Sequence, residues 1–247
     1  MTTDYDQISE LYRRAKQQPW RHAVEEYSFM RLLGDLRGRR VVDLACGEGF
    51  FTRKLKEAGA ASVRGTDISQ AMIALARQQE SADPLGIEYI VEDARAEGPR
   101  LEHDVVATAW LLVYAHHREE MDVMCRGLAR QLAPGGRLVT LTTNPDVYVF
   151  PDPDYRPYGF TIDVEDEARD GAPILWTIHL DDTTSFEIEN YYLPRSAIQS
   201  SLEEAGFRDV VFYDLELDPA AAARDPEGTW DEFLRYPPAV LIDAIRT

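Results

Sequence analysis

Apolar residues along this chain follow two alternating periods. Short runs rich in β-branched residues, typical of buried strands, lie at 39–45, 61–67, 86–93, 104–115 and 136–144. Between these runs, apolar residues recur every three or four positions, as in amphipathic helices. Such stretches cover 50–59, the segment after the N-cap residue Ser69, and a segment around Met121 and Leu128. Strands that alternate with helices predict a mostly parallel sheet covered by helices.

The two ends of the chain depart from this alternation. Residues 5–36 have a helical pattern that is interrupted at Pro19, and 144–159 form a loop rich in Pro, Asp and Tyr. Three alternating runs then predict an antiparallel meander at 160–167, 173–180 and 185–192. The remainder predicts a helix closed by Gly206, a strand, a short helix at 229–236 and a last strand. We predict one domain over 1–247, consisting of a helical lid (1–37), a core (38–143), an insertion (144–193) and a C-terminal part of the core (194–247).

The stretch RRVVDLACGEGFF, at 39–51, combines a strand, a glycine turn and the start of a helix. Gly47 and Gly49 would let the backbone approach a ligand at the helix N-terminus. Asp67 ends the second predicted strand, 20 positions after Gly47. That spacing is typical of an acidic residue that binds a ribose.

Charge and motif disfavour a dinucleotide at this turn. Thr52 stands where the third glycine of G-x-G-x-x-G would lie, and Asp43 and Glu48 would repel a pyrophosphate. A ligand with an adenosine at one end and cationic groups at the other is compatible with these carboxylates. S-adenosylmethionine, which carries a sulfonium and an ammonium, is such a ligand.

Five segments resemble the successive motifs of class I S-adenosylmethionine-dependent methyltransferases. They cover about 38–142 in the expected order: VVDLACGEGFFTRKL, GTDISQAMIALAR, EYIVEDA, DVVATAWLLVYA and LAPGGRLVTL. The resemblance implies a Rossmann-like α/β fold, with a seven-stranded, mostly parallel sheet whose last two strands pair antiparallel. The N-terminal run at 4–29 further resembles the toxoflavin synthase group of N-methyltransferases.

The resemblance also implies residue roles. Asp93 would accept a hydrogen bond from the adenine amino group, and the cofactor or its product S-adenosylhomocysteine would contact Tyr12, Arg21, Asp43, Gly47, Gly49, Asp67, Ile68, Met72, Asp93, Ala94 and Ala109. Aromatic candidates for the acceptor pocket are Trp20, Trp110, Tyr114, Trp176 and Tyr191. Each has a structural alternative: Tyr12 and Trp20 could pack the lid, and Trp110 could be core. His116 or His117 could be a general base or cap a loop, so no catalytic residue is assigned.

Net charge and cysteine content restrict the classes of binding partner and the cellular location that we expect. The net charge is −18, and 141–247 carry 7 basic against 23 acidic side chains. We therefore expect no nucleic-acid partner and no anionic membrane surface. No apolar run reaches the roughly 18 residues that a transmembrane helix needs. Cys46 and Cys125 do not indicate a disulfide framework, which favours a cytoplasmic location. No His or Cys cluster indicates a metal.

These expectations define a function. The chain is expected to methylate a small, planar aromatic heterocycle, most specifically a ring nitrogen of a didemethyltoxoflavin-type azapteridine in toxoflavin biosynthesis. The alternatives are an O- or C-methyltransferase of another aromatic metabolite and a noncatalytic regulator that binds S-adenosylmethionine.

Overall fold

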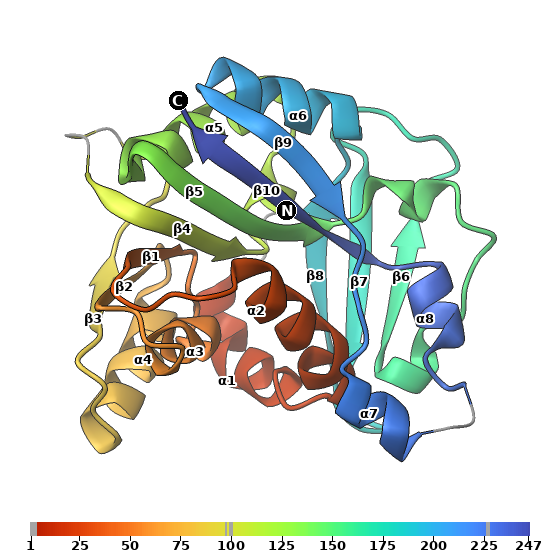
Figure 1. The fold of residues 1–247 in the computed structure, drawn as a ribbon. Helices are drawn as coiled ribbons and strands as arrows, with labels where there is room; N and C mark the ends of the chain where they lie inside the picture. Colours follow the sequence, from red (N-terminus) through yellow and green to blue (C-terminus); the bar gives the residue numbers. More distant parts are fainter. Residues whose placement is uncertain (1–3, 97, 99–100, 226–227) are drawn as a thin grey trace.

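The computed structural model describes residues 4–96, 98, 101–225 and 228–247 (Figure 1). Its main sheet has seven strands in the order β3-β2-β1-β4-β5-β10-β9. The four pairings from β3 to β5 are parallel, whereas β10 is antiparallel to both β5 and β9. The seven strands are β1 (Arg40–Leu44), β2 (Ser62–Asp67), β3 (Glu88–Val91), β4 (His103–Ala109), β5 (Leu132–Thr143), β9 (Phe207–Tyr213) and β10 (Ala239–Arg246). The predicted Rossmann-like methyltransferase fold is confirmed.

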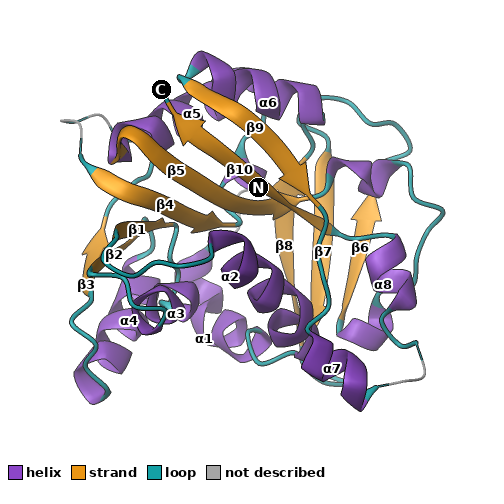
Figure 2. Cartoon of the chain, viewed as in Figure 1, coloured by secondary structure: helices purple, strands orange, loops and turns teal. Residues whose placement is uncertain are grey.

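Helices cover both faces of the main sheet (Figure 2). Val41 of β1 packs in the core beside α3 and α4, whereas its neighbour Val42 packs in the core beside α5 and α6. Successive strand side chains point to opposite faces, so a β-branched pair fills both cores. The covering helices are α3 (Phe50–Glu57), α4 (Gln70–Ala82), α5 (Arg118–Gln131) and α6 (Arg195–Glu204), and two short helices, α7 (Pro219–Arg224) and α8 (Asp231–Arg235), precede β10. The sequence pattern missed α7.

The N-terminal segment forms two helical pieces beside the glycine turn. α1 (Tyr5–Ala15) precedes Pro19, and a π-helical stretch (Arg21–Glu26) continues directly into α2 (Tyr27–Leu33). Pro19 therefore lies at the start of the second piece, where its missing N–H costs little. The Asp6 carboxylate accepts hydrogen bonds from the Ser69 hydroxyl and the Ala71 N–H. This contact docks α1 onto the N-terminus of α4.

The predicted strand over 104–115 is wrong in its second half. β4 ends at Ala109, Trp110 takes a φ of 67°, and Leu112–Tyr114 form a 3₁₀ turn. A left-handed residue breaks the extended backbone, so the apolar run continues as a buried turn. The chain leaves the sheet at the point where β4 reaches its carboxyl end.

The predicted insertion is a separate antiparallel sheet of β6 (Phe160–Val164), β7 (Pro173–His179) and β8 (Ser185–Tyr191). It stands beside the main sheet, with α8 next to it (Figure 1). Trp20 from the N-terminal segment and Phe233 from α8 pack into an aromatic cluster with Phe160 and Trp176 of this sheet. In the part of the chain that the structure describes, no helix is long and apolar enough to cross a bilayer.

Candidate active site

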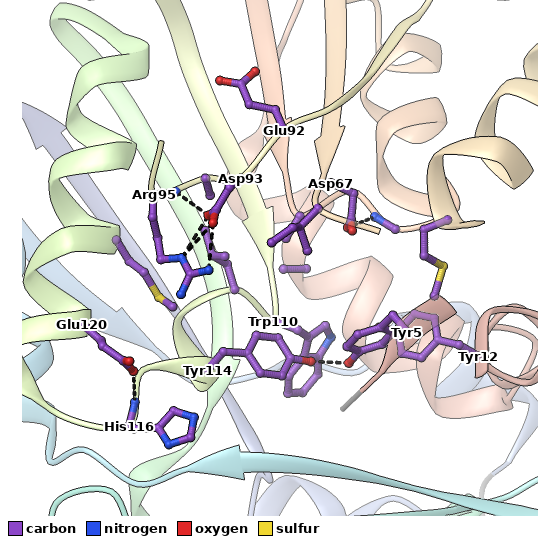
Figure 3. A pocket seen from close by; sticks show the side chains of 18 residues that line it. Tyr5, Tyr12, Asp67, Glu92, Asp93, Arg95, Trp110, Tyr114, His116 and Glu120 are labelled. Carbon is purple, nitrogen blue, oxygen red and sulfur yellow. Dashed lines mark hydrogen bonds and ion pairs between the residues drawn. The ribbon is translucent and has the colours of Figure 1, made fainter. Parts of the chain in front are cut away.

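A cavity of about 250 Å³ opens at the carboxyl ends of β1, β2, β3 and β4 (Figure 3). Open parallel sheets bind their ligands at this edge. Two of the residues that line it directly follow strands and have left-handed backbones: Ala45 with φ 58° and Trp110 with φ 67°. Non-glycine residues in this region cost roughly 1–2 kcal/mol each and cluster at functional sites.

The glycine turn is fastened to the second strand by Asp67. Its Oδ2 accepts a hydrogen bond from the Gly47 N–H at 2.8 Å, and its Oδ1 accepts one from the Ser69 N–H at 2.9 Å. Burial raises the pKa of Asp67, and the two backbone N–H groups oppose that shift. Each carboxylate oxygen has a second lone pair, so the side chain can still accept ligand hydroxyls from the cavity.

One side of the cavity combines acidic and apolar side chains. Ile68 is 61% exposed although it is apolar, and it lines the cavity with Met72 and Ala94. Asp93 lies beside them and accepts from the Arg95 guanidinium at 2.8 Å, and this hydrogen bond lowers the pKa of Asp93. An exposed apolar residue next to a carboxylate suits a ring whose edge carries a hydrogen-bond donor.

The opposite side is aromatic. Tyr5 from α1, Tyr12 from α1, Trp110 and Tyr114 line it, and the hydroxyl groups of Tyr5 and Tyr114 are hydrogen-bonded to each other (Figure 3). Burial raises the pKa of both the Tyr5 and the Tyr114 phenol. Both hydroxyls therefore stay protonated near neutral pH, where they can donate or accept hydrogen bonds but are poor proton abstractors.

His116 and α5 complete the wall. The imidazole of His116 stacks on Tyr191 of β8 with ring centroids 3.6 Å apart, and its backbone N–H donates to Glu120 at 2.8 Å. Glu120 and Met124 line the cavity from α5. The insertion thus supports the cavity through His116, whereas Tyr191 itself lies behind the wall.

The structure brings together ten of the predicted residues. These line one cavity: Tyr12, Gly47, Asp67, Ile68, Met72, Asp93, Ala94, Ala109, Trp110 and Tyr114. Three further predicted acceptor residues do not line this cavity: Trp20 and Trp176 pack in the buried aromatic cluster, and Tyr191 stacks on His116. Trp176 still touches the site indirectly, because its ring packs edge-on against Trp110 at 5.5 Å.

Three predicted cofactor residues also lie outside the cavity lining. Asp43 is buried and accepts from the Thr52 hydroxyl at 2.6 Å, and burial raises its pKa to about 7. Gly49 is the N-cap residue of α3, and the buried Arg21 is ion-paired with Glu25. Glu48 lines a different hollow, between α1 and α3. Asp43 and Glu48 therefore do not line this cavity, and its negative charge comes from other carboxylates.

Sequence reasoning missed several lining residues, namely Ala45, Glu92, Arg95, Leu111, Glu120 and Met124. Arg95 directly follows the predicted Asp93–Ala94 pair, so the sequence could have indicated it as a lining residue. Glu120 and Met124 are one helical turn apart on α5, and only the path of the chain after β4 brings them back to the cavity.

The lining is electrostatically negative. The lining contains one guanidinium, that of Arg95, and four carboxylates, those of Asp67, Glu92, Asp93 and Glu120. This balance favours a cationic ligand and opposes a pyrophosphate. Among the described residues, no group of three or more His, Cys, Asp or Glu side chains is arranged to hold a metal ion.

The comparison with known families agrees with this geometry. Residues 41–136 match the family described as "Methyltransferase domain". Over these residues the chain is similar to methyltransferase domains, in agreement with the Rossmann-like methyltransferase fold of the main sheet. The matched segment runs from β1 to the beginning of β5 and contains the glycine turn and most of the cavity lining.

Three known proteins illustrate the similarity. The N-demethylindolmycin N-methyltransferase of Streptomyces griseus is 29% identical over 198 residues, covering 76% of this chain and 77% of that protein. A ubiquinone biosynthesis O-methyltransferase of Pseudomonas fluorescens is 30% identical over 120 residues, and the match spans only 50% of its length. The crystal structure of an S-adenosylmethionine dependent methyltransferase from Mesorhizobium loti superposes with a TM-score of 0.64 at 24% identity, covering 90% of this chain and 97% of that one. The last likeness shows the shared fold.

Proposed function

We propose that this protein transfers a methyl group from S-adenosylmethionine to a nitrogen atom of a small, planar heterocycle. The observation that carries the proposal is one cavity with two chemically different sides. The first side presents Asp67, Ile68 and Asp93, and the second presents Tyr5, Trp110 and Tyr114. An adenosine with a cationic tail suits the first side, and a flat acceptor suits the second.

The residues of the first side would hold the cofactor. Asp67 would accept from the ribose hydroxyls, Asp93 from the adenine amino group, and Ile68 and Met72 would pack on the adenine ring. When bound, S-adenosylmethionine supplies an electrophilic methyl group. The negative lining would stabilise its cationic groups. Holding two reactants in line can contribute about 7–11 kcal/mol to a transfer of this kind.

The residues of the second side would orient the acceptor. Trp110 offers a ring face and the paired Tyr5 and Tyr114 hydroxyls offer a hydrogen bond. Because burial raises the pKa of both tyrosines, neither removes a proton readily. This favours an acceptor nitrogen that attacks through its own lone pair over a hydroxyl that must first be deprotonated.

Because residues 4–29 resemble the toxoflavin synthase group, an azapteridine such as didemethyltoxoflavin is the first specific acceptor to test. The similarity to the N-demethylindolmycin N-methyltransferase supports nitrogen as the acceptor atom. The net charge of −18 supports a small molecule over a nucleic acid. O-methylation is the second candidate, since a ubiquinone biosynthesis O-methyltransferase is similar to this chain over 120 residues.

The test is incubation with methyl-labelled S-adenosylmethionine and matched pairs of heterocycles that differ only in presenting a ring nitrogen or a hydroxyl group. We expect label on nitrogen, with azapteridines among the acceptors. Label only on oxygen would establish the second candidate instead. Cofactor binding without transfer to any member of the panel would favour the noncatalytic regulator.

A further inference from the structure

The indole of Trp110 is held from behind the cavity wall by a buried carboxylate. Its Nε1–H donates to Oε1 of Glu25 at 2.7 Å, across 85 positions of sequence. Glu25 is fully buried and belongs to the π-helical stretch Arg21–Glu26, while Trp110 lines the cavity and is 9% exposed. Hydrogen bonds to an ionised acceptor are roughly twice as strong as neutral ones.

Two cations keep Glu25 ionised. Arg21 Nη1 lies 2.7 Å from its Oε2, and Lys16 Nζ lies 3.6 Å from its Oε1, with all three side chains buried. Burial alone would raise the pKa of Glu25, but Arg21, Lys16 and the Trp110 indole together outweigh it and lower the pKa. The carboxylate is thus charged and held from several directions.

Two rare backbone conformations meet at this hydrogen bond. Trp110 has a φ of 67°, which is an outlier for a bulky residue, and Glu25 lies in a π-helix, a rare form that frequently occurs at functional sites. The indole is also enclosed by Trp176, edge-on at 5.5 Å, and by the Arg21 guanidinium at 5.6 Å. A fold that needed only a core tryptophan at position 110 would not require this arrangement.

We propose that Glu25 is a positioning residue that fixes the Trp110 ring at the acceptor side of the cavity and so couples the N-terminal helices to methyl transfer. The catalytic consequence rests on the proposed function, whereas the structural coupling does not. Glu25 itself does not line the cavity, so it acts only through Trp110.

The test uses the chain of residues 1–247 with Glu25→Gln, Trp110→Phe and the double variant. Gln keeps an acceptor oxygen but removes the charge, and Phe keeps a ring but removes the N–H. Trp230→Phe is the matched control, since Trp230 is equally buried at 9% and packs on Tyr158, away from the cavity lining. If Glu25→Gln does not fold, Trp110→Phe still tests the contact, because it leaves Glu25 paired with its two cations.

The first measurement is independent of activity. The protein has 4 tryptophans, and Trp110→Phe identifies which indole N–H resonance in a ¹H–¹⁵N spectrum belongs to Trp110. We expect Glu25→Gln to move that resonance and to speed its exchange with solvent, and Trp230→Phe to leave it in place. An unmoved resonance in Glu25→Gln would overturn the inference whatever the enzyme does.

The second measurement is steady-state kinetics. We expect kcat to fall roughly tenfold or more in each single variant, with S-adenosylhomocysteine affinity within about twofold of the unchanged protein. The double variant should be no slower than the slower single variant, because both changes remove one contact. A positioning role would be contradicted if the losses in kcat of the two single variants added in the double variant. It would also be contradicted if Glu25→Gln displaced the Trp110 indole resonance but kept a normal kcat. A displaced resonance with no transfer in the unchanged protein would instead contradict the proposed function.

Discussion

The carboxylate of Asp67 and the N–H of Gly47 are joined by a 2.8 Å hydrogen bond at the centre of the cavity edge. This contact ties the end of β2 to the turn after β1, so the ribose-binding candidate also fixes the shape of the glycine turn. A bound ribose would share a carboxylate that the fold has already oriented. Preorganisation of this kind reduces the cost of ordering a side chain on binding.

The two glycines of the turn provide a matched pair of variants. Both have left-handed backbones, with φ 56° at Gly47 and 91° at Gly49, so alanine strains either position. At Gly49 a Cβ would also lie 2.5 Å from the Tyr89 hydroxyl oxygen, whereas at Gly47 nothing lies within 4 Å. Thermal unfolding should therefore show Gly49→Ala melting at least about 2–4 °C below Gly47→Ala. Equal melting temperatures would mean that Tyr89 moves aside at no cost.

Gly127 of α5 allows the loop after β3 to pack closely against this helix. A Cβ at this buried position would lie 2.1 Å from the backbone oxygen of Ala94. Gly127→Ala should push Ala94 and Arg95 toward the cavity and weaken S-adenosylhomocysteine binding by tenfold or more. Calorimetry would measure this, with the exposed Arg126→Ala on the same helix as control. An unaltered dissociation constant would show that α5 shifts instead of the loop.

The buried Asp43 predicts a pH dependence of stability. Its pKa is raised to about 7, above an unfolded value of about 3.9, so the folded protein binds the extra proton between these limits. Its stabilising contribution is complete below about pH 4 and is lost as pH rises through about 7. Asn can still accept from Thr52 but does not titrate. Between pH 5 and pH 8, the unfolding free energy of the unchanged protein should therefore decrease by a few kcal/mol relative to that of Asp43→Asn. Urea titrations at each pH measure both free energies. Parallel profiles would contradict an elevated Asp43 pKa.

Much of the fold follows from periodicity. Doublets such as Val41 and Val42, which fill two cores at once, identify the central strands, and the spacing from Gly47 to Asp67 identifies the cavity edge. The end of β4 could not be placed, because Trp110 continues an apolar run and only its left-handed backbone ends the strand. The assignment of all 247 residues to one domain stays a prediction.

Predicted residues that follow the strands lie together in the cavity, whereas several whose position depends on long-range packing lie outside it. Asp67, Asp93 and Trp110 lie next to strand ends, so topology alone brings them together. Trp20 and Trp176 instead fill the contact between the N-terminal helices and the meander, a contact that no local pattern reveals. Arg21 was assigned to the cofactor, whereas the structure pairs it with Glu25. Trp110 proved to be both a cavity wall and a buried ring, so the two interpretations of its role are compatible.

The most direct test of this account is calorimetric titration of S-adenosylmethionine into the unchanged protein and into Asp67→Ala. Asp182→Ala, an exposed aspartate in the turn between β7 and β8, is the control. We predict one cofactor per chain, and an affinity roughly ten- to a hundredfold lower for Asp67→Ala only, since a hydrogen bond to a charged group contributes about 1.5–3 kcal/mol. Binding of equal strength in all three proteins, or none in the unchanged protein, would contradict the assignment of this cavity to S-adenosylmethionine.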